Sequence, residues 1–506
     1  MLGGSRNSEA LQKRLEAVRG SDPSRALRRI LRLLRDALAK ETNTRSRLRL
    51  LELVLDRAEP EVSAVEVALD RAALPLSATL QQAARSANRL LKALGLGYAE
   101  TAAQVSGRWR KLRYGAALRG AVTRAMTVEA RRLRLAYRCY SRGSRRAWTQ
   151  LHYLYAVASK EGFATPAGHD KLSTPRRIYV DALLLALAQP NTFAAGQLHR
   201  ARAYIGQYGH LASLEPAMAM PESQIARFVV RAGEGRPATP LPRVRTEALQ
   251  PNDLLLDCVR LARKTQTQLA GLRTRVSPAK LGLSPEVERI ETLALLHKLN
   301  LCWNAGQARR HHRINLNPRV DVVAGFDRLW NFLAGPAFRR RSEDAQDATL
   351  PAMDGHSEWT VLNLSPEGLS LRYISGDAAG LHVGDVVGVR QRDRRALDVC
   401  IARQALNAGV NQFLLGLEGL GPQALPVTIE WGDRWNRYVV RAIMVPRMPR
   451  FHGTCGLMAP FGALHTAGEV RVRDASRTLT MRVDRRLERT SSCELFALTP
   501  VASERR

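Results

Sequence analysis

The stretch that most constrains the fold of this chain is Val361–Leu371, with the sequence VLNLSPEGLSL. Its apolar ends flank a short polar segment that contains Pro366 and Gly368. Proline fixes its own φ at a value that suits turns, and glycine can adopt a positive φ without a Cβ clash. Leu369 and Leu371 then alternate with polar residues, as in a half-buried strand. The stretch therefore predicts two short strands joined by a tight turn.

Two motifs in this region carry groups that suit a phosphate-bearing ligand. The first is R-x-x-x-R and the second is N-x-S-x-x-G, and their residues are Arg309, Arg310 and Arg313, then Asn363, Ser365 and Gly368. A guanidinium group matches phosphate oxygens two at a time and can stack on a purine ring. Asn and Ser side chains can hydrogen-bond a base edge, and glycine lets backbone approach a ligand closely. The second motif is the more specific, because R-x-x-x-R is common in a chain with many arginines.

In this order, beside a predicted β domain, the two motifs resemble the two halves of the PilZ-domain signature. The resemblance covers residues 306–420 and implies a small β-barrel that binds cyclic di-GMP. It implies that Arg309, Arg310 and Arg313 hold phosphates and stack on guanine. It also implies that the second motif completes the site on the barrel surface. The segment 314–362 is longer than the usual spacing in that family and predicts an inserted helix or loop, which leaves open whether the ligand site is functional.

The rest of the chain divides by its pattern of apolar residues. Helical spacing over residues 1–232, broken at Gly, Pro and Ser, predicts an all-α helical array. Within it Asp22 and Pro23 mark a helix start, and Pro60, Gly95 and Gly97 mark helix ends. Residues 233–305 indicate a linker followed by helices at 251–272 and 285–303, and short alternating runs predict a second β domain at 421–506. The predicted fold class is multidomain α + β.

The chain is strongly basic, with 78 Lys and Arg against 46 Asp and Glu and a net charge of +32. Such a charge attracts polyanions, but it is spread along the sequence, so we expect nucleic-acid binding to be weak and unspecific. Two helices carry Arg-rich faces, which we interpret as solvated faces; docking of an acidic partner or of nucleic acid is the alternative. Their residues are Arg25, Arg28, Arg29, Arg32 and Arg35, and Arg131, Arg132, Arg134 and Arg138.

No motif for catalysis or metal binding stands out. The sequence contains no H-E-x-x-H, G-x-S-x-G or Walker loop, and we expect no catalytic residue, no metal and no cofactor besides the dinucleotide ligand. His311 and His312 are adjacent and would face opposite sides of a strand. The six cysteines are scattered without a C-x-x-C pair, which predicts free thiols in a reducing cytosol. No apolar run is long enough to span a bilayer, so we expect a cytoplasmic protein.

The interpretation that we favour is a bacterial-type cyclic di-GMP receptor that is not an enzyme. The barrel would bind the dinucleotide, and the helical N-terminal half would contact a protein partner. By resemblance, the output would be motility, attachment or exopolysaccharide control. Two alternatives remain: a nucleic-acid-binding regulator that uses the Arg-rich helices, and a PilZ-like scaffold that has lost its ligand and acts through protein contacts. The output pathway and the oligomeric state stay open.

Overall fold

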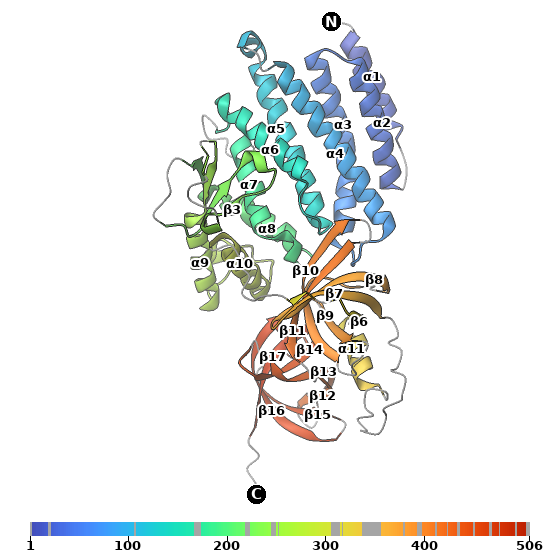
Figure 1. Cartoon of the computed structure of the whole chain (residues 1–506), viewed down its shortest axis with the longest axis vertical. Helices are drawn as coiled ribbons and strands as arrows, with labels where there is room; N and C mark the ends of the chain where they lie inside the picture. Colours follow the sequence, from blue (N-terminus) through green and yellow to red (C-terminus); the bar gives the residue numbers. More distant parts are fainter. Residues whose placement is uncertain are drawn as a thin grey trace. The chain divides into compact units, whose positions relative to one another are not determined.

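The structure is a computed structural model of the chain. It describes residues 3–18, 22–105, 108–165, 174–217, 223–243, 249–250, 252–304, 314–315, 317–335, 356–377, 380–391, 397–409, 412–421, 424–432, 436–448, 451–464, 468–474, 476–490 and 493–501. The chain forms two compact units (Figure 1). Unit 1 comprises Met1–Ala72, Leu76–Pro190 and Gly196–Ala308, and unit 2 comprises Ala73–Pro75, Asn191–Ala195 and Arg309–Arg506.

Unit 1 is mainly helical, and Figure 1 shows its long N-terminal helices side by side. The helices are α1 (Gly3–Glu16), α2 (Pro23–Lys40), α3 (Thr44–Asp70), α4 (Ala78–Val105), α5 (Arg108–Arg138), α6 (Arg145–Lys160), α7 (Pro175–Leu187), α8 (Gln197–Tyr208), α9 (Val259–Arg273) and α10 (Arg289–Asn304). Unit 1 also contains a small antiparallel sheet with the strand order β1-β4-β2-β3. Its strands are β1 (Ser213–Pro216), β2 (Arg227–Val230), β3 (Thr239–Pro240) and β4 (Leu254–Asp257). The helix predicted at 251–272 therefore starts later, at α9, because β4 takes its first residues.

The start of α2 follows the sequence prediction, whereas the predicted end at Pro60 is wrong. Asp22 accepts a hydrogen bond from the Ser24 amide at 2.8 Å, with Pro23 in the first turn. Helix α3 continues through Pro60, whose side chain is exposed. Val54, Ala58, Val62 and Val65 form one buried stripe across that point. Packing of this stripe outweighs the cost of about 3 kcal/mol that an interior proline imposes on a helix.

Gly95 and Gly97 do not end a helix either, because α4 runs through both of them. A Cβ on Gly95 would lie 2.5 Å from Oε1 of Glu129 on α5, and one on Gly97 would lie 2.8 Å from Leu51 on α3. The two glycines therefore allow α4 to pack closely against its neighbours. Close helix contact, which local sequence patterns do not report, is the reason for these residues.

The two Arg-rich helices differ from one another. On α2, Arg25, Arg29, Arg32 and Arg35 are exposed. On α5, Arg132 and Arg138 are buried, and Arg131 and Arg138 form ion pairs with acidic residues of α3. The prediction of a solvated face is therefore wrong for α5, whose arginines lie between helices.

The first part of unit 2 is a ring of antiparallel strands. Its strands are β5 (Ile314–Asn315), β6 (Arg319–Ala324), β7 (Ser357–Ser365), β8 (Gly368–Gly376), β9 (Val386–Gln391), β10 (Leu397–Gly409) and β11 (Gln412–Gly421). The ring closes in the order β7-β6-β9-β10-β11-β8, because β8 also pairs with β7. Strand β5 pairs with β7 on the same edge as β6. Trp359 of β7 is fully buried and makes edge contacts with Tyr373 and Phe413. The predicted small barrel is confirmed.

The C-terminal strands form a second closed barrel, in the order β12-β13-β14-β17-β16-β15. They are β12 (Leu425–Gly432), β13 (Arg437–Met448), β14 (Thr454–Pro460), β15 (Glu469–Arg473), β16 (Thr478–Arg489) and β17 (Cys493–Pro500). Counting from β6 in the first barrel and β12 in the second, strands 1–2, 2–3, 3–6, 6–5, 5–4 and 4–1 pair in both. The second β module thus repeats the connectivity of the first.

The two barrels share an apolar core within unit 2. Helix α11 (Phe326–Ala334) lies between β6 and β7 in sequence, and its Leu329 and Leu333 pack with Val386 of the first barrel and with Ile443 and Met458 of the second. The indole N–H of Trp330 donates to the Val427 carbonyl at 3.2 Å. The extra length of the predicted 314–362 insertion thus includes a helix that joins the barrels. The remaining inserted residues, 336–355, lie outside the described part.

Two further observations concern membrane and redox chemistry. None of the described helices is long and apolar enough to cross a membrane. All six cysteines lie in the described part, and none of them forms a disulfide. Four are buried, and burial raises the pKa of the Cys302 thiol to about 11, so this thiol stays protonated and unreactive at neutral pH.

Candidate ligand-binding site

The N-x-S-x-x-G motif forms the turn between β7 and β8. Ser365 and Gly368 are paired across the hairpin, and Pro366 and Glu367 make the two-residue loop. The Ser365 hydroxyl donates a hydrogen bond to the Gly368 carbonyl at 3.1 Å. The predicted hairpin is confirmed at the predicted place. The contact also shows that Ser365 has a structural task in the turn, while its hydroxyl oxygen can still accept a hydrogen bond.

Asn363 lies on the outer face of the barrel. Val361 is paired with Leu371, and both are buried in the interior. Asn363 is paired with Ser370, the neighbour of Leu371, so these two face the opposite, outer side. Arg372, two residues further along β8, shares that side and is exposed. The outer face therefore presents an amide, two hydroxyls and a guanidinium in one row. Sequence reasoning missed Ser370 and Arg372, although their alternation with Leu369 and Leu371 already assigned them to one face.

The φ of Gly368 lies outside the left-handed range, so the turn does not need a glycine for its backbone conformation. Instead, Gly368 allows two backbones to come close together. It is paired with Glu418 of β11, and a Cβ at Gly368 would lie 2.0 Å from the Leu417 carbonyl oxygen. Real Cβ atoms do not come that close to a backbone oxygen. The glycine is thus needed where β8 joins β11 and the ring closes.

Strand β5 connects the two motifs in space. Ile314, which directly follows Arg313 in the sequence, is paired with Leu364, and Asn315 is paired with Asn363. The chain that leaves R-x-x-x-R therefore joins the strand that carries N-x-S-x-x-G. Arg309, Arg310 and Arg313 themselves, with His311 and His312, lie outside the described residues.

An exposed apolar pair lies on the opposite side of β7 from the polar row, because Leu364 alternates with Asn363 along the strand. Ile314 is 66% exposed and Leu364 is 38% exposed, and cross-strand partners project to the same side of a sheet. These side chains offer apolar surface near the β7–β8 turn, on the side of β7 away from Asn363. No local sequence pattern indicates that these two residues are paired and exposed.

The second barrel lacks both motifs at the corresponding places. The connection from β13 to β14, which matches the β7–β8 turn in strand order, runs Pro449-Arg450-Phe451-His452-Gly453 and contains no N-x-S-x-x-G. The segment before β12, from Gly421 to Ala424, contains no arginine. Only the first barrel combines the two motifs. In the part of the chain that the structure describes, no group of three or more His, Cys, Asp and Glu could hold a metal ion.

The chain is similar in sequence to a known receptor. Residues 9–219, nearly all of which belong to unit 1, match the family model described as the N-terminal domain of the cyclic-di-GMP receptor FimW. Over 490 aligned residues, this chain is 24% identical to the protein named Cyclic-di-GMP receptor FimW of Pseudomonas aeruginosa, covering 82% of this chain and 77% of the relative. A share of 82% exceeds what residues 9–219 can supply, so the similarity extends beyond the helical region. The chain is therefore similar, over most of its length, to a cyclic-di-GMP receptor.

Proposed function

We propose that this protein is a receptor for cyclic di-GMP and that the ligand binds on the outer face of the first barrel, at the β7–β8 hairpin. The observation that carries the proposal is the pairing of Ile314, the residue after Arg313, with Leu364 between Asn363 and Ser365. The similarity to a cyclic-di-GMP receptor supports the choice of ligand. Binding, and not catalysis, is the activity that we propose.

Each group would have a separate task in binding. Arg309, Arg310 and Arg313 would hold phosphates and stack on guanine, because guanidinium groups form paired charge-assisted hydrogen bonds. Asn363 and Ser365 would contact a base edge, and Ser370 and Arg372 would extend that contact along β8. The second barrel, without the ordered pair of motifs, would act as a structural partner of the first.

Calorimetric titration of the purified chain with cyclic di-GMP tests the site. Arg313→Ala should weaken binding about tenfold or more, because it removes a charge-assisted contact with a phosphate. Arg319→Ala is the matched control: this arginine is also near β5, but it is exposed and pairs with Glu358 at 2.9 Å. The control should bind as the unchanged protein does. Equal affinities for Arg313→Ala and the unchanged chain would refute the site, and no heat from the unchanged chain would favour the scaffold alternative.

We further propose that binding is relayed through the segment that joins the units. Arg309 to Arg313 stand in the sequence between α10 of unit 1 and β5 of unit 2. Phosphate contacts would fix this segment against the hairpin, and the helical unit would pass the change to a protein partner in the cytoplasm. A ligand can shift such an equilibrium only by binding one arrangement more tightly than the other.

Hydrogen exchange with and without cyclic di-GMP tests the relay. Protection should rise at 305–318 and 361–370, and to a smaller extent in α10, because ligand contacts slow local opening. The same experiment on Arg313→Ala supplies the baseline at a ligand concentration that saturates only the unchanged chain. A rise confined to 361–370 would contradict the relay and leave the ligand site standing.

A further inference from the structure

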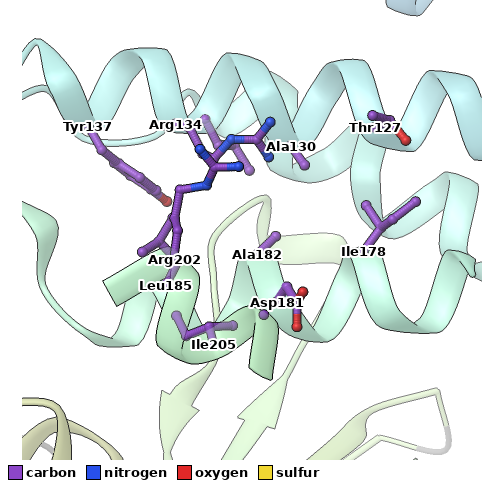
Figure 2. Close-up of a pocket in the computed structure, with 12 residues that line it drawn as sticks. Thr127, Ala130, Arg134, Tyr137, Ile178, Asp181, Ala182, Leu185, Arg202 and Ile205 are labelled. Atoms are coloured by element: carbon purple, nitrogen blue, oxygen red, sulfur yellow. The ribbon is translucent and has the colours of Figure 1, made fainter. Parts of the chain in front are cut away.

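A pocket of about 210 Å³ lies between α5, α7 and α8 in unit 1, far in the sequence from the barrel motifs. Its walls are mainly apolar, and they include Leu133, Ile178, Leu185 and Ile205. Two arginines, Arg134 of α5 and Arg202 of α8, enter it from different helices, and Figure 2 shows their guanidinium groups close together. Nothing in the proposed receptor function uses this pocket.

The two guanidinium groups lack the partners that their neighbours have. On the same face of α5, Arg131 pairs with Glu59 and with Glu66 at 2.9 Å, and Arg138 pairs with Asp70 at 3.0 Å. Among the described residues, no hydrogen bond or ion pair is made by Arg134 or Arg202. Each guanidinium carries five N–H donors, so the pocket contains many donors that bind no protein acceptor.

Asp181, the acidic side chain of the pocket, does not neutralise Arg134 and Arg202. The carboxylate of Asp181 on α7 lies 2.8 Å from Nε of Arg177, one turn earlier on the same helix. Burial raises the pKa of Asp181 to about 6, so it is ionised at neutral pH but shared between Arg177 and the pocket arginines. The one acidic side chain that lines the described pocket therefore already serves another cation.

The lowered pKa values of Arg134 and Arg202 fit two positive charges that no close anion neutralises. Burial, and next the charge of Arg202, lower the pKa of Arg134 to about 9, and burial lowers the pKa of Arg202. Guanidinium groups keep their proton at pH 7, so two like charges share this mainly apolar pocket; Glu66 of α3 attracts both but makes no hydrogen bond with either. An oxyanion between them would relieve the repulsion and accept paired hydrogen bonds from both.

We propose that this pocket binds a small oxyanion, such as phosphate or the phosphate group of a small metabolite, between Arg134 and Arg202. The volume limits the ligand, since pockets for drug-sized molecules span about 300–1,000 Å³. A whole cyclic dinucleotide is thus too large, and the site is separate from the barrel site. The apolar walls accept a short carbon body behind the anionic group.

Inorganic phosphate is the probe for this site, with chloride at equal ionic strength as the reference. Thermal unfolding of the full chain is followed by far-ultraviolet circular dichroism, which reports mainly the helical unit. Phosphate at about tenfold above its Kd should raise the midpoint by about 3–6 °C. Arg134→Met and Arg202→Met should abolish that rise. Without phosphate, each should unfold no earlier than the unchanged chain, because the repulsion is gone.

Arg131→Met, on the same helix but ion-paired, is the matched control. It should unfold earlier, because Glu59 and Glu66 lose their partner, and it should keep the rise with phosphate. Arg313→Ala should also keep the rise, which separates this pocket from the barrel site. The proposal is overturned if phosphate raises the midpoint of Arg134→Met and Arg202→Met as much as that of the unchanged chain. It is equally overturned if Arg313→Ala alone removes the rise.

Discussion

Replacing Gly368 by alanine should destabilise the first barrel by about 3 kcal/mol or more. The added Cβ would lie 2.0 Å from the Leu417 carbonyl oxygen and 3.0 Å from the Glu418 Cα, and both are backbone atoms of the paired strand. A flexible side chain could turn aside, but here β8 and β11 must separate at the last residue pair of their shared ladder. Overpacking of a tight site costs about 1–3 kcal/mol, and a lost strand pair adds to it. Urea unfolding followed by tryptophan fluorescence measures the change.

Gly419→Ala is the matched control for this substitution. Gly419 lies on β11, near Gly368 and its partner Glu418, and a Cβ built on it meets no atom within 4 Å. Its φ is also outside the left-handed range, so alanine should change the stability by less than about 1 kcal/mol. Equal stabilities of the two variants would show that Gly368 is not required for strand pairing. The result also guides binding experiments, because loss of ligand in Gly368→Ala reports loss of the barrel.

The hairpin that carries the candidate site could be predicted from the sequence because its information is local. Pro366 and Gly368 stand within a few residues of the strands that they join, and Leu369 and Leu371 alternate in register with the interior. The placement of Ile314 beside Leu364 was not predictable in the same way. It depends on pairing across an insertion, which no window of neighbouring residues reports.

The sequence predictions that failed all concern contacts between distant segments. Pro60 and Gly95 are helix breakers by propensity, but a buried stripe crosses Pro60, and Gly95 lies where α4 packs closely against Glu129 of α5, so both helices continue. The arginines of α5 follow the pattern of a solvated face, yet acids on α3 draw them between helices. The same limit applies to the pocket arginines, since Arg134 and Arg202 stand far apart in the sequence and meet only after folding. The shared strand order of the two barrels is likewise visible only in three dimensions, because the second does not carry the ordered pair of motifs.

Among the polar side chains at the junction of the two barrels, Arg403 should cost the most stability when it is replaced. Strand β10 carries it, and it pairs with Glu418 of β11 in its own barrel and with Glu488 of β16 in the other. One of its contacts with Glu488, from Nη2, measures 2.6 Å. The two carboxylates, acting against burial, raise the pKa of Arg403 above its usual range. Because Glu418 is also the partner of Gly368, this network lies beside the strand pair that closes the first barrel.

Arg403→Leu should lower the free energy of unfolding by about 1–3 kcal/mol, since it leaves two partly buried carboxylates without their cation. Breaking a fully buried pair costs about 3–5 kcal/mol, and the partial exposure of Arg403 reduces that figure through solvent screening. Arg482→Leu is the control on β16: its ion pair with Asp484 is exposed, so its effect should stay below about 0.5 kcal/mol. Glu488→Gln in the Arg403→Leu background should regain part of the loss, because it removes one of the unpaired charges. If Arg403→Leu matches Arg482→Leu in urea unfolding, the apolar core alone joins the barrels, and the second barrel supports the ligand site by packing and not by this charge network.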